Sequence, residues 1–420
     1  MPIRSKAAQS TEAKILLLCA QTELCHAARN TLIELLQTDV DYSKLIQLAE
    51  YHGIYTFLHQ HLVRHGANLI PPAVLVRLRQ SARIKARHNF FLAAELLRIK
   101  TLFDERNIRY LSFKGPCLAI QAYRSLSQRV FLDLDLIVSP DDVPKAIDVL
   151  STGGYSQEPQ RNPPMSTELM RSQLFRRFSN EQSFAIRQGQ REDPAFVVDL
   201  HWNIAEHSVM HILPETLHQF ATEVDIFGRL VPTLQVELAL VLLCAHGTKH
   251  HWELLKWLVD IYELLRSHPS LDWNTVYSLS KKYGASNKVD LALWLCAKEL
   301  GNDANVPQEA LSRVAANERL LNLAARTVTS WFDSGSSLKD FRHYLQYHAS
   351  TSVSPIQAAQ FLLQEICCPT LPTYLRCPLP EKIFFLYFLI HPAFLVADFL
   401  VDNLIKSAEP ERSGAIGHAH

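Results

Sequence analysis

Three acidic side chains on two short apolar runs have the residue types and the spacing for metal chemistry. Asp133 and Asp135 lie in the run 130–138, and Asp199 lies in the run FVVDLHW at 196–202. Side chains two residues apart on a strand share one face, so the first two carboxylates would lie side by side and repel each other. A divalent cation removes that conflict, and an oxygen-rich site suits Mg²⁺ or Mn²⁺. We predict that Asp133, Asp135 and Asp199 are catalytic and bind the metal.

The same acids allow two other interpretations. The first pair could be solvated on an edge strand, although Asp is depleted in strands and the leucines that alternate with these acids, starting with Leu132, would fill the other face. Asp199 could instead be a structural acid that pairs with Arg129 or Lys114. If the two strands are neighbours, the three carboxylates converge. Such a triad can hold two metals, one that activates an attacking oxygen and one that holds a triphosphate.

A turn upstream of the paired acids has the composition of a phosphate site. Lys114-Gly115 ends a strand-like run at 109–113, and Pro116 suits the first turn of a helix. Glycine lets a backbone approach a phosphate, and a helix N-terminus offers free N–H groups. Lys114 adds a positive charge. Arg129 stands at the start of the strand with the acids, where it could reach a phosphate or be a surface arginine. We predict Lys114, Gly115 and Arg129 as phosphate-binding residues.

The elements that must position these residues form a short α/β segment between helical regions. Residues 12–66 are helical in pattern, and a long helix follows from Pro71-Pro72 to about Asn107. The predicted strands are 109–113, 130–138, 182–187 and 195–202. Residues 156–180 are expected to form a polar loop around Pro163-Pro164, and the chain is expected to be helical again from Pro232.

The link after the strand with the paired acids has a helix-start pattern. Ser139 can cap a helix, Pro140 fits its first position, and Asp142 completes a capping box. Gly153-Gly154 would end that helix in a left-handed conformation. This passage is the clearest α/β pattern in the chain.

Composition limits the class of partner. The chain has 420 residues, enough for two or three domains, and 48% of them are hydrophobic. Its 42 Lys and Arg balance 42 Asp and Glu, which argues against a chain built to coat nucleic acid or anionic lipid. We therefore expect no extended nucleic acid as a partner. Eight cysteines without a C-x-x-C pair predict buried, reduced thiols.

Two apolar segments bear on the relation to membranes. The run 15–20 is too short for a secretory signal, which favours a cytoplasmic protein. The run 383–401 is long and apolar, but His391, Pro392 and Asp398 interrupt it. A helix buried in protein is favoured there over a peripheral membrane contact, and both are favoured over a span. A peripheral contact would suit a membrane-associated biosynthetic accessory.

Several of these motifs follow one another in a recognisable order. They are KGPCLA at 114–119, RVFLDLDLIV at 129–138, a helix ending in Gly154-Tyr155, DLHW at 199–202, HGTKHHW at 246–252, and Asp260. Together they resemble the uncharacterised bacterial nucleotidyltransferase family of the polymerase-β superfamily. The resemblance covers about residues 40–265, and its specificity lies in the combined set rather than in any one motif.

The resemblance implies an α+β fold, in which a polymerase-β-like nucleotidyltransferase core, a short mixed sheet with helices, is flanked by N- and C-terminal helical regions. We place the N-terminal region at 1–88, the core at 89–230 and the C-terminal region at 231–420. The implied activity moves a nucleoside monophosphate from an NTP to an acceptor hydroxyl on a small molecule, a protein or an RNA end. By position, Asp133 and Asp135 would hold the metals, and Asp199 would be the third carboxylate and the base for the acceptor.

One residue departs from the superfamily pattern. The wider superfamily has Gly-Ser or Gly-Gly at the phosphate turn, whereas here Gly115 is followed by Pro116, which has no N–H and no hydroxyl. One phosphate contact is therefore missing, and Lys114 would compensate for it. The departure leaves a second hypothesis open, a catalytically degenerate module that binds a nucleotide or a partner protein.

The helical segment after the core adds candidate pocket residues. His246 and His250 are four residues apart, a spacing found in zinc sites, but Gly247 stands where a zinc protease has Glu. We predict instead that His250 and Lys249 line the nucleotide pocket, with Lys249 on a phosphate. His201, two residues after the third acid, is expected to join them. Packing against the core is the alternative for the histidines.

Overall fold

Among the residues that the structure describes, five strands form one mixed sheet. The computed structural model describes residues 10–161, 165–187, 196–203, 212, 214–301, 304–332 and 341–408. In sheet order the strands are β1 (Tyr110–Ser112), β2 (Leu134–Val138), β5 (Phe196–His201), β4 (Glu181–Ile186) and β3 (Ser156–Gln157). β2 and β5 are parallel, and the other neighbours are antiparallel. The predicted α+β class, with a short mixed sheet and flanking helices, is confirmed.

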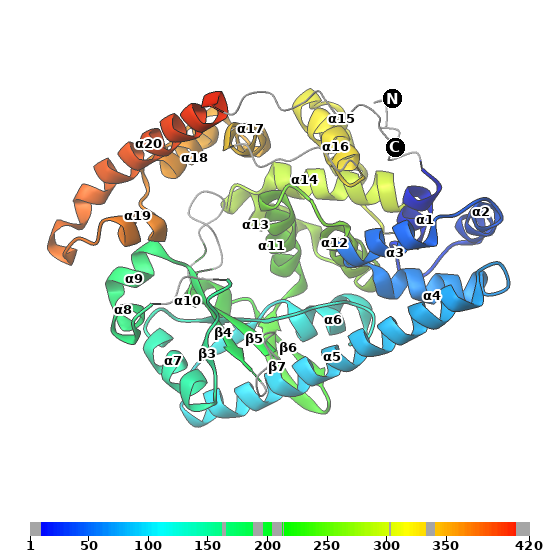
Figure 1. The fold of residues 1–420 in the computed structure, drawn as a ribbon, viewed down its shortest axis with the longest axis horizontal. Coiled ribbons are helices and arrows are strands. Elements are labelled where there is room, and N and C mark those ends of the chain that lie inside the picture. Colours follow the sequence, from blue (N-terminus) through cyan, green and yellow to red (C-terminus); the bar gives the residue numbers. More distant parts are fainter. Residues whose placement is uncertain are drawn as a thin grey trace, which may run out of the picture.

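The two faces of the sheet have different neighbours. Alternate residues of β2, from Leu134 to Val138, are buried in a core that they share with α5 (Pro72–Glu105) and α7 (Val143–Thr152). α5 runs along one side of the molecule below the strands (Figure 1), and it confirms the long helix expected after residue 71. Asp135 and the acids beside it project from the opposite face, which therefore has to meet polar partners.

A helical body covers that opposite face. Its helices are α1 (Thr11–Cys19), α2 (His26–Leu36), α3 (Tyr42–Tyr51), α4 (Tyr55–His65), α6 (Gly115–Tyr123), α11 (Val236–Lys249), α12 (Leu255–Ser267), α13 (Trp273–Lys282), α14 (Ser286–Leu295), η2 (Cys296–Leu300), α15 (Gln308–Ala315) and α16 (Glu318–Ser330). N-terminal and C-terminal segments share one hydrophobic core there. Regions far apart in sequence thus form one support for the sheet.

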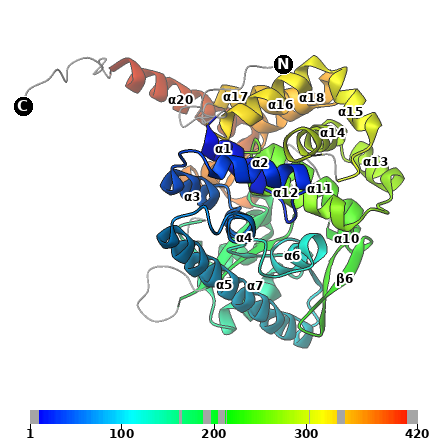
Figure 2. The same ribbon diagram turned by 90° about the vertical axis from the view of Figure 1, so that its right-hand side faces the viewer.

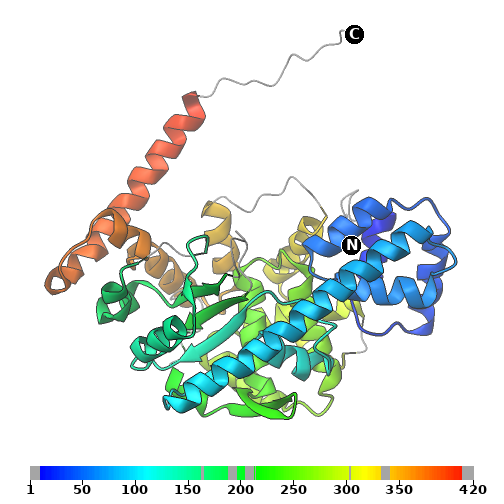
Figure 3. The same ribbon diagram turned by 60° about the horizontal axis from the view of Figure 1, so that its bottom comes forward.

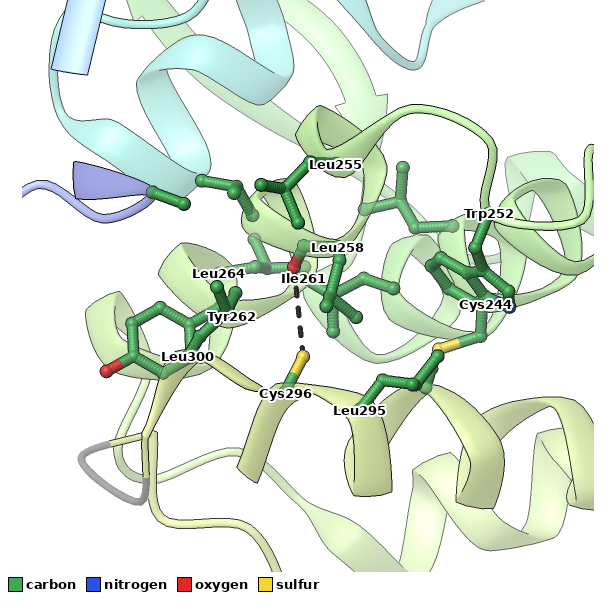
Figure 4. Close-up of a cluster of buried hydrophobic side chains, with 14 of the residues drawn as sticks. Cys244, Trp252, Leu255, Leu258, Ile261, Tyr262, Leu264, Leu295, Cys296 and Leu300 are labelled. Carbon is green, nitrogen blue, oxygen red and sulfur yellow. Dashed lines mark hydrogen bonds between the residues drawn. The ribbon is translucent and has the colours of Figure 1, made fainter. Parts of the chain in front are cut away.

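Figure 4 shows part of this core. Trp252 and Tyr262 are fully buried, and the thiols of Cys244 and Cys296 lie among leucines. All eight cysteines are free, as expected, but Cys25 is exposed and three near the C-terminus are only partly buried. The expectation that all the thiols are buried was therefore wrong for these four.

The last helices extend across one end of the molecule. They are α17 (Phe341–Thr351), α18 (Pro355–Cys367), α19 (Leu371–Arg376), η3 (Glu381–Leu386) and α20 (Tyr387–Ala408). Tyr387 is buried and its hydroxyl donates to the carbonyl of Cys377 over 2.8 Å, whereas the far part of α20 projects away from the body (Figure 3). None of the described helices is long and apolar enough to cross a membrane.

Several local predictions around the acids were wrong. The strand expected over 130–138 begins only at Leu134, and Leu132 is 59% exposed instead of filling the core face. The capping box does not form, because the helix begins at Val143 and the Ser139 hydroxyl donates to Glu215. The left-handed stop is confirmed, since Gly154 has φ +93°.

Two segments contain structure that the sequence pattern did not predict. The segment expected to be a loop over 156–180 contains β3, α8 (Thr167–Arg171) and α9 (Gln173–Phe178). Pro163-Pro164, at the centre of the expected loop, lies outside the described residues. Ala195, the first residue of the strand predicted over 195–202, also lies outside them. After α10 (Pro214–His218), a hairpin of β6 (Ala221–Ile226) and β7 (Arg229–Leu234) precedes the helices, so Pro232 lies in a strand. The hairpin flanks α6 (Figure 2).

The predicted domain boundaries fall inside regular elements. α5 is continuous across residue 88, and β7 is continuous across residue 230. The N-terminal helices and the helices from α11 to α16 also share one core. The division into 1–88, 89–230 and 231–420 thus remains a prediction about the chain rather than a visible break in it.

Candidate active site

Strand register brings two of the predicted acids side by side. β2 and β5 run parallel with Asp135 opposite Asp199, and β4 places Ser183 on the other side of Asp199. The Ser183 hydroxyl donates to Asp199 Oδ1 over 2.6 Å. Asp133 lies one residue before β2 and is two residues from Asp135, so it projects to the same side. The three carboxylates therefore meet on one face of the sheet, over its interior strands β2 and β5.

Arg161 links the outer two acids. Its Nη1 lies 2.8 Å from Asp133 Oδ2 and 2.7 Å from Asp199 Oδ2. The residue belongs to the turn after β3, where its N–H donates to the carbonyl of Glu158. Sequence reasoning missed Arg161 because nothing in its polar segment distinguishes it from any other solvated arginine. A positive charge thus already occupies the point between two of the predicted metal ligands.

His201 connects the acids to β4. Its Nε2 lies 3.2 Å from Asp135 Oδ1 and its Nδ1 lies 2.9 Å from Glu181 Oε2. Burial alone would lower the pKa of His201, but Glu181 and Asp135 raise this pKa to about 10. The ring is therefore an imidazolium at neutral pH, and it lowers the pKa of Glu181 to about 2. His201 lies beside the acids, as predicted, but its nitrogens bind carboxylates.

The two central carboxylates differ in charge environment. Burial alone would raise the pKa of Asp135, but Lys114 and His201 hold this pKa well below its usual range. Burial and the neighbouring Asp133 and Asp135 raise the pKa of Asp199 to about 6. Asp199 therefore binds a proton more readily than Asp135 does.

The donor chemistry of the acids fits a divalent cation after one rearrangement. Among the described residues, no three His, Cys, Asp or Glu side chains are grouped closely enough to hold a metal ion as they stand. The Arg161 guanidinium holds positive charge between Asp133 and Asp199, and Asp135 lies in register with Asp199. A cation that replaced Arg161 would meet carboxylate oxygens from adjacent strands, the ligands that Mg²⁺ and Mn²⁺ prefer.

The predicted phosphate turn has the backbone conformation that requires glycine. Gly115 has φ +50°, and a Cβ there would lie 3.2 Å from the carbonyl oxygen of Asp133. It opens α6, with Pro116 in the first turn. The Lys114 ammonium lies 3.4 Å from His246 Nδ1 and 3.9 Å from Asp135 Oδ1. The lysine therefore points across the site toward the helical body.

Arg129 is held by an acid of that helical body. Its Nε and Nη2 donate to the two carboxylate oxygens of Asp260 on α12, over 2.8 and 3.0 Å. The Tyr123 hydroxyl donates to the same carboxylate. Arg129 is buried, so the interpretation as a surface arginine was wrong. The described contacts give it a structural role, and its predicted phosphate contact stays a prediction.

The three acids, the two arginines, His201 and the turn at Lys114-Gly115 line a cavity of about 900 Å³ between the sheet and the helices. The wall opposite the acids consists of His246, Lys249, His250, Lys256 and Trp257. A third side is formed by residues 364 and 365 near the end of α18, the link 368–370, and residues 371 and 372 at the start of α19. The predicted pocket residues Lys249 and His250 are therefore at the cavity.

The two histidines of the zinc-like spacing are packed together with an aromatic ring. The ring centres of His246 and His250 lie 4.6 Å apart, and both rings lie against Trp257. Burial and nearby lysines hold the pKa of His246 well below its usual range and lower the pKa of His250 to about 3. A Cβ on Gly247 would lie 2.3 Å from the Trp252 ring. Packing thus accounts for the glycine at the position where a zinc protease has Glu.

Comparison with known proteins agrees with this geometry. A family model described as uncharacterised nucleotidyltransferase matches residues 38–301, more than half of the chain. That range includes the sheet, the acids and the lysine-bearing wall of the cavity. No curated protein matches the chain.

Proposed function

The chain belongs to the family of uncharacterised nucleotidyltransferases, and on that premise we propose that it is an active, metal-dependent enzyme that transfers a nucleoside monophosphate from an NTP to an acceptor hydroxyl. The observation that carries the proposal is the meeting of Asp133, Asp135 and Asp199 on one wall of a cavity whose opposite wall carries lysines. The acceptor would be a small molecule, a protein or an RNA end.

Each group has a role that follows from its position. Asp133, Asp135 and Asp199 would hold Mg²⁺ or Mn²⁺, which when bound would screen the triphosphate and polarise the reacting phosphate. His201 fixes the orientation of Asp135 through a charged hydrogen bond. Asp199, with its pKa near 6, is ionised at neutral pH and would accept the proton of the acceptor hydroxyl.

The cations of the cavity would receive the phosphates. Lys114, Gly115 and Lys249 line it beside His250, and these residues are the proposed contacts to the nucleotide. The balanced charge of the chain does not supply the extended basic surface that a long nucleic acid requires. The proposal is therefore confined to an acceptor group that fits a cavity.

A thermal-shift titration tests the proposal directly. Each NTP is added with and without Mg²⁺ to wild-type protein and to Asp133→Asn/Asp135→Asn. Ligand at about 100 times its dissociation constant stabilises the folded state by about 2.7 kcal/mol, so we expect a Mg²⁺-dependent shift that the double variant loses. If no NTP shifts the wild type, the chain is the catalytically degenerate module, and partner capture becomes the relevant experiment.

A membrane-peripheral role is a second proposal, carried by the end of the chain. Phe385, Leu389 and Val396 are each at least 60% exposed on η3 and α20, and large exposed apolar side chains on one segment mark contact surfaces. We expect Phe385→Ser/Leu389→Ser to reduce cosedimentation with phosphatidylcholine vesicles, whereas Ile84→Ser on α5, also exposed, leaves it unchanged. Wild-type protein that stays in the supernatant would exclude a contact through 383–401.

A further inference from the structure

The cavity has two walls of opposite charge. The sheet contributes carboxylates, and most of its charged groups are paired, since Arg161 and His201 bind the acids. The helical wall contributes Lys249 and Lys256, and Lys114 points toward it. An anion that enters between the walls would thus meet lysines on one side and the proposed metal-binding acids on the other.

Lys256 differs from the other cations of this cavity. It lies in the first turn of α12, where its N–H donates to the carbonyl of His52. Its aliphatic stem packs on Gly53, since a Cβ there would lie 2.6 Å from Lys256 Cδ. Within the described part of the chain, its ammonium makes no hydrogen bond and no ion pair, although the residue is half-buried.

A half-buried ammonium without a partner has an electrostatic cost. Burial and the charge of Arg129 lower the pKa of Lys256, although Asp260 and Asp133 act in the opposite direction. The fixed stem leaves the ammonium little freedom to escape into water. A bound anion would remove this cost, so the position is suited to a ligand rather than to stability of the fold alone.

Two further lysines, Lys249 and Lys114, lie close to the same part of the cavity as Lys256. Lys249, at the end of α11, and Lys256 both act on the pKa of His246, as Lys114 does. The neutral His246 imidazole lies 3.4 Å from the Lys114 ammonium, which holds that charge toward the helical wall. Three lysines from three elements thus act on one half-buried imidazole.

We propose that Lys256, with Lys114 and Lys249, forms the subsite for the triphosphate of the NTP. This inference rests on the proposed function and adds to it where the phosphates lie. They would be held by side-chain ammonium groups of α11 and α12, and the turn at Gly115, where Pro116 has no N–H, would serve mainly to bring Lys114 into place. The metal would then lie between this subsite and the acids.

The test measures binding of two probes, inorganic tripolyphosphate and each NTP, in the presence of Mg²⁺. Lys256→Met removes the charge and keeps the stem that packs on Gly53, and Lys256→Arg keeps the charge. Lys281→Met, on an exposed part of α13, is the matched control. We expect Lys256→Met to lower the affinity for both probes roughly 10- to 100-fold. Lys256→Arg should lower it much less, and the control should not change it.

A separate Mn²⁺ titration without nucleotide distinguishes the subsite from the proposed function. Lys256→Met should bind Mn²⁺ as the wild type does, and its thermal midpoint reports whether it folds. NTP binding that Asp133→Asn abolishes but Lys256→Met leaves unchanged would overturn the subsite and keep the function. Tripolyphosphate binding that depends on Lys256, without any metal-dependent NTP binding, would overturn the function and keep an anion site. Wild-type protein that binds neither probe would overturn both.

Discussion

Two arginines line the same cavity. Their surroundings differ, and the difference distinguishes a residue that stabilises the fold from one that belongs to the proposed chemical site. Arg129 is buried at the seam between the sheet and the helical body, where both of its donors meet one acid, Asp260. Arg161 lies over the face of the sheet that carries the acids, with 35% of its side chain exposed, and one nitrogen bridges Asp133 and Asp199.

The difference lies in what remains if each guanidinium is removed. Without Arg129, the buried Asp260 would keep, among the residues that the structure describes, only the Tyr123 hydroxyl as a hydrogen-bond partner. A buried uncompensated charge is costly. Without Arg161, two neighbouring acids would repel each other near water, which another cation can correct. The Arg129 pair therefore joins two regions of the fold, whereas Arg161 holds the place of a cation.

The largest expected effect tests whether the acids bound by Arg161 form the chemical site. Asp133→Asn should lower nucleotidyl transfer on the order of a thousand-fold or more, because it removes a metal ligand, while the thermal midpoint stays near that of the wild type. Transfer is measured as release of labelled pyrophosphate. Asp141→Asn, an exposed acid in the link after β2, serves as the control. Normal turnover of Asp133→Asn would remove the metal assignment.

The next effect tests whether the pair of Arg129 and Asp260 stabilises the fold. Asp260→Ala should lower the free energy of unfolding by about 3 to 5 kcal/mol, because it leaves a buried guanidinium without its acid. Denaturant titration measures this change. Asp398→Ala breaks the equally bidentate but exposed pair with Arg376 and should leave the midpoint unchanged. Equal losses of unfolding free energy in the two variants would show that burial does not make the Arg129 pair more stabilising than the exposed pair.

The acids could be predicted from the sequence because they obey short-range rules. Asp133 and Asp135 share a face through the two-residue period of a strand, and Asp199 breaks an apolar run in the same way. The structure adds that Asp135 lies opposite Asp199. The sheet class and the long helix α5 also follow from local periodicity, and both are confirmed.

The partners of the acids could not be predicted, because they arrive through tertiary contacts. Arg161 is 28 residues from Asp133 in sequence and 38 from Asp199, and no periodicity encodes such a distance. Lys256 likewise has no local feature that shows its ammonium to be unpaired. Charges of one type look alike in sequence, and only the fold decides which of them face each other.

Two failures of local prediction have equally physical causes. The hairpin of β6 and β7 turns at Phe227 and Gly228, which both have positive φ. Phe is uncommon in that conformation, so its presence does not predict such a turn. Residues of β6 are mostly exposed or half-buried, so no apolar run marked the strand. The Ser139 hydroxyl donates to Glu215 and does not cap the helix, because an acid that is distant in sequence lies close to it in the fold.

A third cation, which is buried like Arg129, sharpens the comparison through its pH dependence. Lys288 on α14 is 5% exposed, its ammonium donates to the Gly284 carbonyl, and it makes no ion pair within the described part of the chain. Burial lowers its pKa from 10.5 to about 8. Below pH 8 both folded and unfolded chains hold the proton, so the cost of the buried charge is fully present. Between pH 8 and 10.5 the unfolded chain binds more protons, so stability rises with pH.

We therefore expect Lys288→Met to be more stable than the wild type at pH 7 by about 1 to 3 kcal/mol, and this gain should shrink as the pH rises from 8 to 10.5. Denaturant titrations at the two ends of that range measure it, with the exposed Lys281→Met as control. A gain that is constant with pH would mean that packing of the methionine, and not the charge, causes it.

The smallest effect is the most informative about Arg161. If this guanidinium holds the place of a cation, Arg161→Gln should bind Mn²⁺ roughly two- to five-fold more tightly than the wild type, because a half-exposed ion pair no longer competes for Asp133 and Asp199. Electron paramagnetic resonance of free Mn²⁺ measures the affinity, and Arg376→Gln, which loses an exposed pair outside the lining of the cavity, is the control. Arg161→Gln should also lose much less unfolding free energy than Asp260→Ala. Weaker Mn²⁺ binding together with a large loss of stability would instead place Arg161 with Arg129, as a clamp that shapes the acids before any metal arrives.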